Sequence, residues 1–397
     1  MPRVLLTFEP PDGGVAEHVL QLARALPERG FDVELAGPLK SELVYSQIDP
    51  SIPVHRIDFR RGYGEPKQDL ASARALGRVM RGKKYDLIHA HSAKAGVITR
   101  LVRAGRKPPV LYSPHCFPFI GEFGDGRRIF ATNVERALAP ITKRILCVCD
   151  DEREQGAAIG IADRRMRVVH NGSASAPAQL DPSTELEKFR GKDGVIIGSV
   201  AVLREQKRVD VLIDAAPAIL AAEPRARVAI IGNGPLEAEL HARATSLGLA
   251  GEPRFSFFPF WPPATTALAA LDVYVLPSSW EAFPIGVLEA LAVGTPQGAT
   301  DVGGTREAVV DGYAGLGPDG GHPRGTVEGE TGLLVPPRDH RALAKAIVEL
   351  IPDAARRQAM ADASRKRHRE HFTLPTMADG IAEVYREVLA EGGRRRR

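Results

Sequence analysis

The sequence predicts an α/β protein with two doubly wound, parallel-sheet domains. Short runs of β-branched and aliphatic residues alternate with amphipathic helical stretches through the first half of the chain, and a second alternating series follows a polar segment. Such alternation is typical of parallel sheets covered by helices. The length of 397 residues suffices for two domains of ordinary size.

In the first series, an apolar run at 4–8 predicts a strand, and Gly13-Gly14 then opens a helix at 15–26. Further strands are expected at 33–36, 54–57, 87–90, 110–112, 145–148 and 168–169, with helices at 92–105 and 127–139. These elements define a first domain over residues 1–180. The polar, proline-containing stretch 173–194 is expected to be a linker.

The second series predicts strands at 195–201, 227–231, 254–258 and 271–276, and helices at 209–221 and 236–246. We place this second domain at residues 195–375. A last amphipathic helix, at 376–390, is expected to cross back to the first domain. Two such domains facing each other would form a cleft, which is a common place for a ligand.

Composition and charge narrow the function classes. The chain has 44% apolar and 26% charged residues and no apolar run long enough to span a bilayer. The short apolar stretch at 4–8 is expected to be a strand and not part of a signal peptide. Three cysteines lack disulfide or zinc-site spacing, so we expect a cytoplasmic protein. Residues 1–190 hold 29 Lys and Arg against 23 Asp and Glu. Two runs, at 74–84 and 94–107, contain basic but no acidic residues. They indicate either a solvated helix face or peripheral contact with an anionic membrane, whereas nucleic acid is not expected.

The segment 277–294 carries two carboxylates, Glu281 and Glu289, across a junction between a turn and a helix. Glu281 is expected in the loop at the carboxyl end of a buried strand, where open α/β sheets bind ligands. The start of the following helix favours an anion such as a phosphate. Carboxylates beside an anion site suit hydroxyl groups, and a sugar nucleotide supplies both.

Basic and imidazole side chains supply further candidates. Lys207, with Arg204 and Arg208, would neutralise a leaving pyrophosphate or form a solvated basic loop. His115 follows a strand between prolines, which suits either a substrate contact or a buried core histidine. The sequence Leu-Ile-His-Ala-His at 87–91 is expected to place its two histidines on opposite sides of the sheet, unable to share a metal.

Glycines mark two further turns. Gly13-Gly14 lies between a strand and a helix, where backbone can approach a phosphate, although such turns also occur for structural reasons. The turn Gly-Asn-Gly-Pro at 232–235 is expected to be mainly structural. No Asp-x-Asp occurs in the sequence, which disfavours a carboxylate-held divalent ion, and we expect no metal and no cofactor.

Taken in order, these motifs resemble the retaining glycosyltransferases of the GT-B fold, in the large family 4. The similarity covers nearly the whole chain and includes the following segments: Gly13-Gly14-Val15 with His18, the stretch 86–92, His115, the stretch 167–172, Lys207, the stretch 232–236, the Glu281–Glu289 pair, Gly303-Gly304 with Glu307, and the stretch 331–335. The two glutamates eight residues apart, with their surroundings, are the most specific element.

The resemblance implies a role for each candidate. Glu289 would hold the ribose hydroxyls of a UDP- or GDP-linked sugar, and Lys207 would stabilise the departing diphosphate. His115 would bond to the donor sugar. Glu281 and the backbone of Ala282, Phe283, Pro284 and Ile285 would hold the sugar and the distal phosphate, so that His115, Lys207 and Glu281 are the candidate catalytic residues. Gly13 and Gly14 would approach the diphosphate, Arg204 is a further candidate contact, and the acceptor would bind the first domain.

Several positions depart from the family pattern. Val202 replaces a usual arginine five residues before Lys207, Gln297-Gly298 replaces a buried hydrophobic pair, and Cys116 occupies a position where glycine is common. The stretch 310–316 resembles 327–333, which indicates an insertion at about 313–330 that forms a surface loop or a lid. We expect a glycosyltransferase acting on a glycolipid, a polysaccharide or a small molecule, and the departures indicate either a divergent enzyme or one whose activity is impaired by the missing cation. The alternatives are a sugar-nucleotide epimerase on the same fold and a degenerate protein that only binds the sugar nucleotide.

Overall fold

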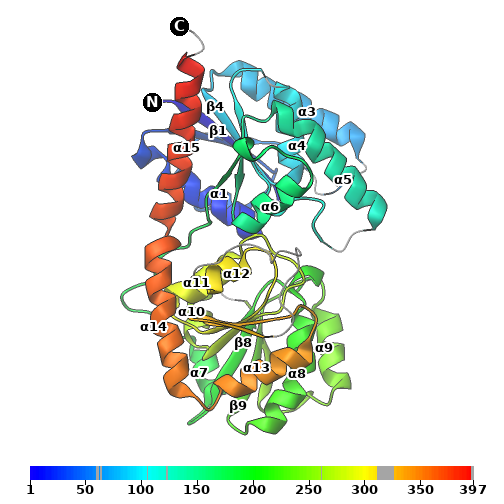
Figure 1. Ribbon diagram of the computed structural model, residues 1–397, viewed down its shortest axis with the longest axis vertical. Helices are drawn as coiled ribbons and strands as arrows, with labels where there is room; N and C mark the ends of the chain where they lie inside the picture. Colours follow the sequence, from blue (N-terminus) through cyan, green and yellow to red (C-terminus); the bar gives the residue numbers. More distant parts are fainter. Residues whose placement is uncertain are drawn as a thin grey trace. The chain divides into compact units, whose positions relative to one another are not determined.

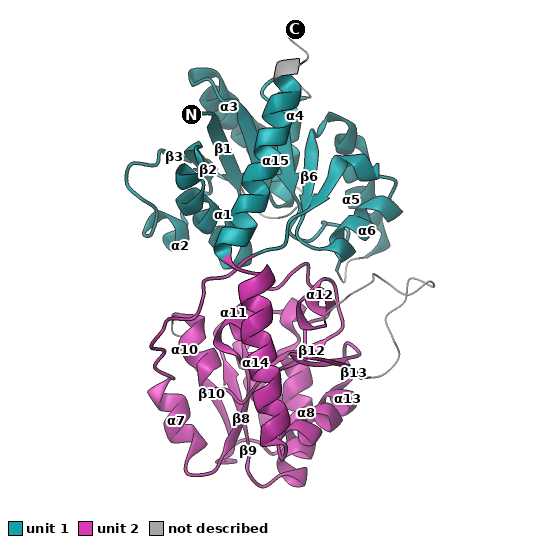
Figure 2. Cartoon of the chain, turned by 60° about the vertical axis from the view of Figure 1, so that its left-hand side comes forward, with its two compact units in different colours: residues 1–171, 374–397 teal, residues 172–373 magenta. Residues whose placement is uncertain are grey.

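The computed structural model describes residues 1–59, 62, 65–104, 106–121, 124–260, 262–310 and 326–394. The chain divides into two compact units (Figure 2). Unit 1 comprises Met1–Asn171 and Leu374–Arg397, and unit 2 comprises Gly172–Thr373.

Unit 1 contains a parallel sheet whose described part has seven strands in the order β3-β2-β1-β4-β5-β6-β7. Its strands are β1 (Arg3–Phe8), β2 (Asp32–Gly37), β3 (Val54–Arg56), β4 (Leu87–His91), β5 (Val110–Ser113), β6 (Arg144–Cys147) and β7 (Met166–Val168). Its helices are α1 (Gly13–Ala25), α2 (Glu42–Tyr45), α3 (Pro66–Gly82), α4 (Ala93–Arg103), α5 (Asp125–Leu138), α6 (Asp150–Ala158) and α15 (Leu374–Arg394). The order reverses direction between β1 and β4, and ligands of such sheets bind at the carboxyl ends beside that reversal.

Alternation of side chains along β1 sets the two faces of this sheet. Val4, Leu6 and Phe8 pack in one buried cluster with residues of α1 and α15. Leu5 points to the other face, into a cluster with residues of α3 and α4. Figure 1 shows these helices on the two sides of the sheet. Nearly continuous apolar strands are therefore explained by burial on both faces.

Unit 2 contains a second sheet, with seven described strands in the order β10-β9-β8-β11-β12-β14-β13, parallel except for the antiparallel β13–β14 pair. Its strands are β8 (Val195–Val200), β9 (Ala226–Ile231), β10 (Phe255–Phe258), β11 (Val273–Leu276), β12 (Gln297–Thr300), β13 (Val327–Gly329) and β14 (Gly332–Val335). Its helices are α7 (Thr184–Arg190), α8 (Val209–Ala222), α9 (Glu237–Ser246), α10 (Ala264–Ala269), α11 (Ile285–Val293), α12 (Thr305–Val309), α13 (His340–Leu350) and α14 (Ala354–His371). The order reverses between β8 and β11.

Two boundaries differ from the sequence-based expectation. Unit 1 ends at Asn171 rather than at residue 180, because the Ser173 N–H donates to the Phe372 carbonyl 2.9 Å away and ties this segment to unit 2. The expected linker at 173–194 contains helix α7, whose first turn is capped by the Ser183 hydroxyl. Side-chain capping of this kind is available to any serine that precedes a helix. The centre of the expected insertion, 311–325, lies outside the described residues.

Candidate functional site

In unit 2, a lysine and a glutamate meet at the carboxyl ends of the central strands. Glu281, in the loop after β11, is only 7% exposed. Its Oε1 accepts hydrogen bonds from Ser278 Oγ at 2.7 Å and from Lys207 Nζ at 2.6 Å. Lys207 ends a short 3-10 helix, Glu205–Lys207, in the loop that follows β8. The structure thus brings together two of the site residues expected from the sequence.

Backbone contacts hold the Glu281 loop in place. The Ser279 N–H donates to the Gln206 carbonyl at 2.9 Å, which links the loop to the one that carries Lys207. On its other side, Gly303 adopts a φ of +52°, and a Cβ there would lie 1.9 Å from the Glu281 carbonyl oxygen. Only glycine allows this approach. The Gly304 N–H then donates to the Ala282 carbonyl at 2.6 Å.

The charges of both carboxylates act on one buried phenol. Tyr274, on β11, is 1% exposed, and its pKa is raised by burial and further by the negative charges of Glu281 and Glu289. Glu289 lies just over one turn into α11. Gly286, in the first turn, leaves room for the phenol, because a Cβ there would lie 2.8 Å from Tyr274 Oη. The two glutamates are therefore neighbours of one buried group.

The segment that joins Glu281 to α11 is anchored by an aromatic side chain. Phe283 is buried and packs edge-on against Phe372, with ring centroids 5.3 Å apart. Ala282, Pro284 and Ile285 complete the approach to the helix. The first N–H groups of a helix have no intrahelical acceptor, so the start of α11 offers donors to an anion.

The other cations near Lys207 differ in availability. Arg208 donates from Nε and Nη2 to the two oxygens of Asp210, at 3.0 and 2.8 Å. Arg204 lies partly buried at the start of the 3-10 helix. Val202, where the family pattern has an arginine, is 50% exposed in the same loop. Arg208 is thus already committed to a carboxylate, which weakens its case as a substitute for the missing arginine.

The glycines of the 232–235 turn have a packing role. A Cβ on Gly232 would lie 1.9 Å from the Ala201 carbonyl oxygen, and one on Gly234 would lie 2.4 Å from that of Leu203. This turn therefore supports the loop that leads to Lys207, in line with the structural interpretation of the sequence.

In unit 1, the expected glycine turn and His115 lie at the carboxyl ends of β1 and β5. Gly13, the first residue of α1, has a φ of +74°, and Gly14 follows it in an exposed position. His115 and Cys116 have φ values of +53° and +92°. Such values are uncommon for non-glycine residues and cluster at functional sites. The Cys116 N–H donates to the buried carboxylate of Glu152 at 2.7 Å, which helps to hold the turn.

The expectation that His89 and His91 point to opposite sides of the sheet is wrong. Residues two apart on a strand share a face, and the two rings are in contact, with centroids 4.0 Å apart. His89 bonds to Tyr385 Oη at 2.7 Å and to Ser113 Oγ at 2.9 Å. His91 Nδ1 lies 3.0 Å from His115 Nε2. Residue spacing on the strand was the signal that could have revealed this.

Two of the expected basic-face residues are not surface charges. Lys94 is 9% exposed and donates to both oxygens of Asp69, at 2.8 and 2.9 Å. Arg100 is fully buried, with its Nη1 2.8 Å from Glu135 Oε2 and its guanidinium over the Tyr112 ring. Each of these charges forms an ion pair with an acidic side chain that is distant in the sequence. The basic character of α4 is weaker than its composition indicates.

The two residues of the Gln297-Gly298 pair on β12 differ in how well their surroundings suit them. A Cβ on Gly298 would lie 2.7 Å from Ile347 Cδ1, so a neighbouring side chain fills the space of the missing one. Gln297 is fully buried. Its Nε2 donates to the Val287 carbonyl at 3.4 Å, whereas its Oε1 has no hydrogen-bond partner among the described residues. The cost of this departure from the family pattern therefore falls on the buried amide of Gln297.

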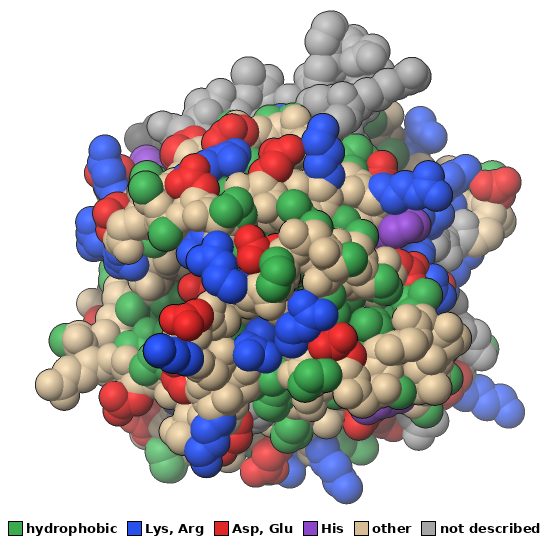
Figure 3. All heavy atoms as spheres, turned by 90° about the horizontal axis from the view of Figure 1, so that it is seen from below, with side chains coloured by type: hydrophobic (Ala, Val, Ile, Leu, Met, Phe, Trp, Pro, Cys, Tyr) green, Lys and Arg blue, Asp and Glu red, His purple; other side chains and the backbone are tan. Residues whose placement is uncertain are grey.

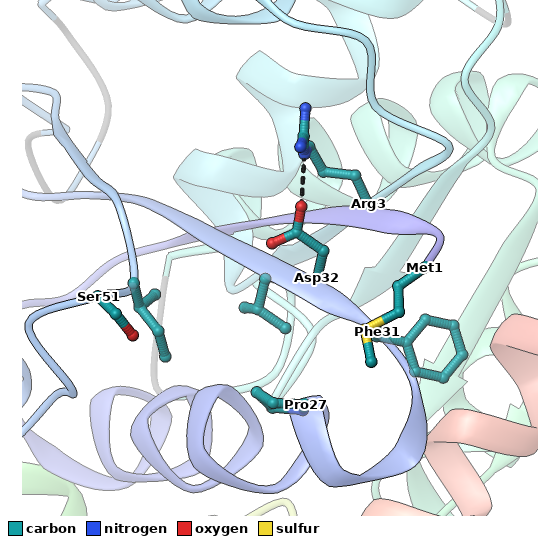
Figure 4. Close-up of a pocket in the computed structure, with 8 residues that line it drawn as sticks. Met1, Arg3, Pro27, Phe31, Asp32 and Ser51 are labelled. Carbon is teal, nitrogen blue, oxygen red and sulfur yellow. Dashed lines mark hydrogen bonds and ion pairs between the residues drawn. The ribbon is translucent and has the colours of Figure 1, made fainter.

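A pocket in unit 1 lies at the amino ends of β1 and β2 (Figure 4). His115, by contrast, lies at the carboxyl end of β5. The lining of the pocket includes Arg3 and Asp32, the first residues of β1 and β2, which form an ion pair at 2.7 Å. Because α/β sheets bind ligands at the carboxyl ends of their strands, we do not assign the ligand site to this pocket.

In the described residues, no helix is both long and apolar enough to cross a membrane.

Family models match both parts of the chain. The model described as "Glycosyltransferase Family 4" matches residues 12–173, and "Glycosyl transferases group 1" matches residues 184–367. The D-inositol 3-phosphate glycosyltransferase of Rhodococcus opacus is 29% identical over 415 residues, covering 94% of this chain and 85% of that protein. The UDP-Gal:alpha-D-GlcNAc-diphosphoundecaprenol alpha-1,3-galactosyltransferase of Escherichia coli is 26% identical, covering 76% of this chain and 80% of that protein.

Solved structures share the fold. HepE of Anabaena, solved in complex with UDP, superposes with a TM-score of 0.75 at 21% identity, over 98% of this chain and 100% of that one. Sucrose-phosphate synthase of Thermosynechococcus elongatus superposes with a TM-score of 0.77 at the same identity and coverage.

Proposed function

The chain belongs to the group 1, family 4 glycosyltransferases of the GT-B fold, and we propose that it transfers a sugar from a UDP-linked donor with retention of configuration. The observation that carries the proposal is the Lys207–Glu281 ion pair at the carboxyl ends of β8 and β11. UDP is favoured over GDP because a relative is named for UDP-Gal and HepE was solved with UDP.

In the proposed complex, Glu289 binds the ribose hydroxyls, and the start of α11 donates to the distal phosphate. Lys207 lies where negative charge develops as the sugar–phosphate bond breaks. Such a preorganised cation lowers the barrier without moving during the reaction. Glu281 keeps Lys207 in position and accepts a hydroxyl of the sugar. For unit 1, we propose that His115 forms a hydrogen bond with the donor sugar and that the backbone of Gly13 and Gly14 contacts its diphosphate.

We propose that the reaction needs no bound metal or cofactor. The leaving diphosphate requires positive charge or hydrogen-bond donors. Lys207, Arg204 and the N–H groups at the start of α11 are the candidates for this task. Transfer in the presence of excess EDTA at the same rate as without it supports this point, and loss of transfer refutes it.

For the acceptor, we propose a glycolipid or a growing polysaccharide at the cytoplasmic face of a membrane, with a small molecule as the alternative. Large apolar side chains are exposed on α3, α4 and α5: Leu70, Leu101, Ile129 and Phe130 are each between 51% and 58% exposed. Exposed cations Arg74 and Arg81 lie on α3. Apolar anchors with basic residues suit an anionic bilayer surface. By contrast, the face in Figure 3 interleaves basic and acidic side chains.

A donor screen tests the central proposal. A ligand that binds only the folded state raises the melting temperature according to its affinity. UDP-sugars are expected to raise the melting temperature, and Glu289→Gln is expected to abolish this rise. Glu349→Gln, at an exposed position on α13, is the control and should retain it. A Glu289→Gln variant that binds UDP-sugars normally contradicts the assignment. Consumption of donor only with acceptor distinguishes a transferase from an epimerase.

Val202 favours one other function, a protein that binds the sugar nucleotide without chemistry. Its half-exposed isopropyl group offers no charge where the family pattern has a guanidinium. Binding of a UDP-sugar without turnover on any acceptor supports this function, and sugar transfer at a measurable rate excludes it.

A further inference from the structure

Three histidines from separate elements of unit 1 form a cluster at the reversal point of its sheet. His18 comes from the second turn of α1, His91 ends β4, and His115 follows β5. One ring nitrogen of each can be chosen so that all three lie within 4.8 Å of one another. The ring centroids of His18 and His115 are 4.6 Å apart, and those of His18 and His91 are 5.4 Å apart.

The cluster has unused donor atoms in a buried setting. His18 is 2% exposed and His91 is fully buried. Among the described residues, neither ring nitrogen of His18 and not Nε2 of His91 has a partner in hydrogen-bond geometry. Burying polar atoms without partners is costly, so a ligand bound by a ring nitrogen of His18 would offset part of a cost already present in the protein.

Burial disfavours the charged form of all three imidazoles. Burial lowers the pKa of His18 to about 4, and it lowers the pKa of His91 and of His115 well below the ordinary value. The Asn171 side chain, which opposes the shift at His18, lies at that ring.

From this geometry we propose that His18, His91 and His115 bind one Zn²⁺ ion. Three imidazole nitrogens with an open fourth position form a familiar zinc site, with Zn–N bonds of about 2.0–2.1 Å. Tetrahedral bonds of that length separate two nitrogens by about 3.3 Å. His91 Nδ1 and His115 Nε2 are 3.0 Å apart, so Zn²⁺ takes the place of the hydrogen bond between them with an opening of a few tenths of an ångström. The proton of that bond moves to the other nitrogen of the ring that carried it, and both imidazoles bind in their neutral form.

His89 is excluded as a ligand although its ring touches His91. Both of its nitrogens are engaged, one by Tyr385 and the other by Ser113. It therefore provides a matched control, since it is buried in the same cluster. His371, which is exposed on α14 in unit 2, provides a second control for loose surface binding.

Zinc binding itself does not depend on the proposed transferase activity, but one consequence does. If His115 contacts the donor sugar, a zinc ion on its Nε2 competes with the donor, and zinc acts as an inhibitor rather than a cofactor. Binding without inhibition would leave the metal site intact and argue against the donor role of His115.

Equilibrium dialysis of the purified full chain with Zn²⁺ at pH 7.5 tests the proposal. We expect one ion per chain, a loss of at least tenfold in affinity for His91→Asn and His18→Asn, and little change for His89→Asn and His371→Asn. Cobalt(II) substitution should give the intense visible absorption of a tetrahedral ion. Circular dichroism and thermal unfolding establish that each variant is folded.

If His91→Asn fails to fold, His115→Asn, at the partly exposed ligand, takes its place. Absence of stoichiometric binding to the unsubstituted protein, or equal binding by His18→Asn, His115→Asn and His89→Asn, overturns the proposal.

Discussion

Lys207 Nζ lies 2.6 Å from Glu281 Oε1, so a cation and a carboxylate from loops 74 residues apart form one unit at the carboxyl edge of the second sheet. Lys207 is 16% exposed and Glu281 7%. The pair leaves the lysine accessible from one side while its carboxylate partner is fixed by Ser278. This arrangement gives the lysine a defined position before any ligand arrives.

Replacing Lys207 tests whether this cation serves the chemical step. Lys207→Met preserves the length of the side chain and removes its charge. We expect kcat to fall by about 10²–10³-fold, as for a lost charge-stabilising donor, with a smaller change in KM. Steady-state transfer kinetics measure both. Lys345→Met, at an exposed position on α13, is the control and should change neither. An unchanged kcat for Lys207→Met would remove the lysine from the mechanism.

Introducing a cation at Val202 tests the departure from the family pattern. Val202 is half exposed, so an arginine fits there without displacing core residues. If a lack of positive charge limits departure of the diphosphate, Val202→Arg should raise kcat by about tenfold. This gain is smaller than the loss of about 10²–10³-fold that follows removal of one charge-stabilising donor. Val202→Gln controls for side-chain size. Equal rates for the arginine variant and the unsubstituted enzyme would indicate that charge at this position is not limiting.

Removing the buried amide of Gln297 should stabilise unit 2. Its Oε1 lacks a partner among the described residues, and its Nε2 makes one long bond to the Val287 carbonyl. Methionine has similar length and no such polar atoms, so Gln297→Met should raise the free energy of unfolding by about 1–2 kcal/mol. Urea unfolding measures the change. Gln358→Met, at an exposed position on α14, should be near neutral. A destabilised Gln297→Met would mean that the amide is satisfied in solution.

Sequence patterns predicted the fold well because strands buried on both faces appear as short apolar runs between helices. Elements such as β1 and α8 lie within one or two residues of their expected bounds. The site was predicted as separate pieces. Lys207 and Glu281 were both identified, but their contact depends on how two loops close, which local periodicity does not encode. Buried partners of Lys94 and Arg100 were missed for the same reason.

Glu34 should make the stability of unit 1 depend on pH. Its carboxylate, 2% exposed, accepts hydrogen bonds at 2.8 Å from Lys83, His55 and Tyr85. Burial alone would raise the pKa of Glu34, but these bonds outweigh it, and the pKa lies below its usual value of 4.5. The folded state therefore holds this proton more weakly than the unfolded state does.

The stabilisation from Glu34 is present above pH 4.5 and is lost as the pH falls through the folded-state pKa. Glu34→Gln should lower the free energy of unfolding by about 1–3 kcal/mol at pH 7, because it removes a charge-assisted acceptor from a buried network. The difference between the two proteins should shrink as the pH approaches 3. Urea unfolding at pH 7, 5, 4 and 3 measures it, with Glu42→Gln on α2 as an exposed control. A difference that stays constant across this range would show that protonation of Glu34 is not coupled to folding.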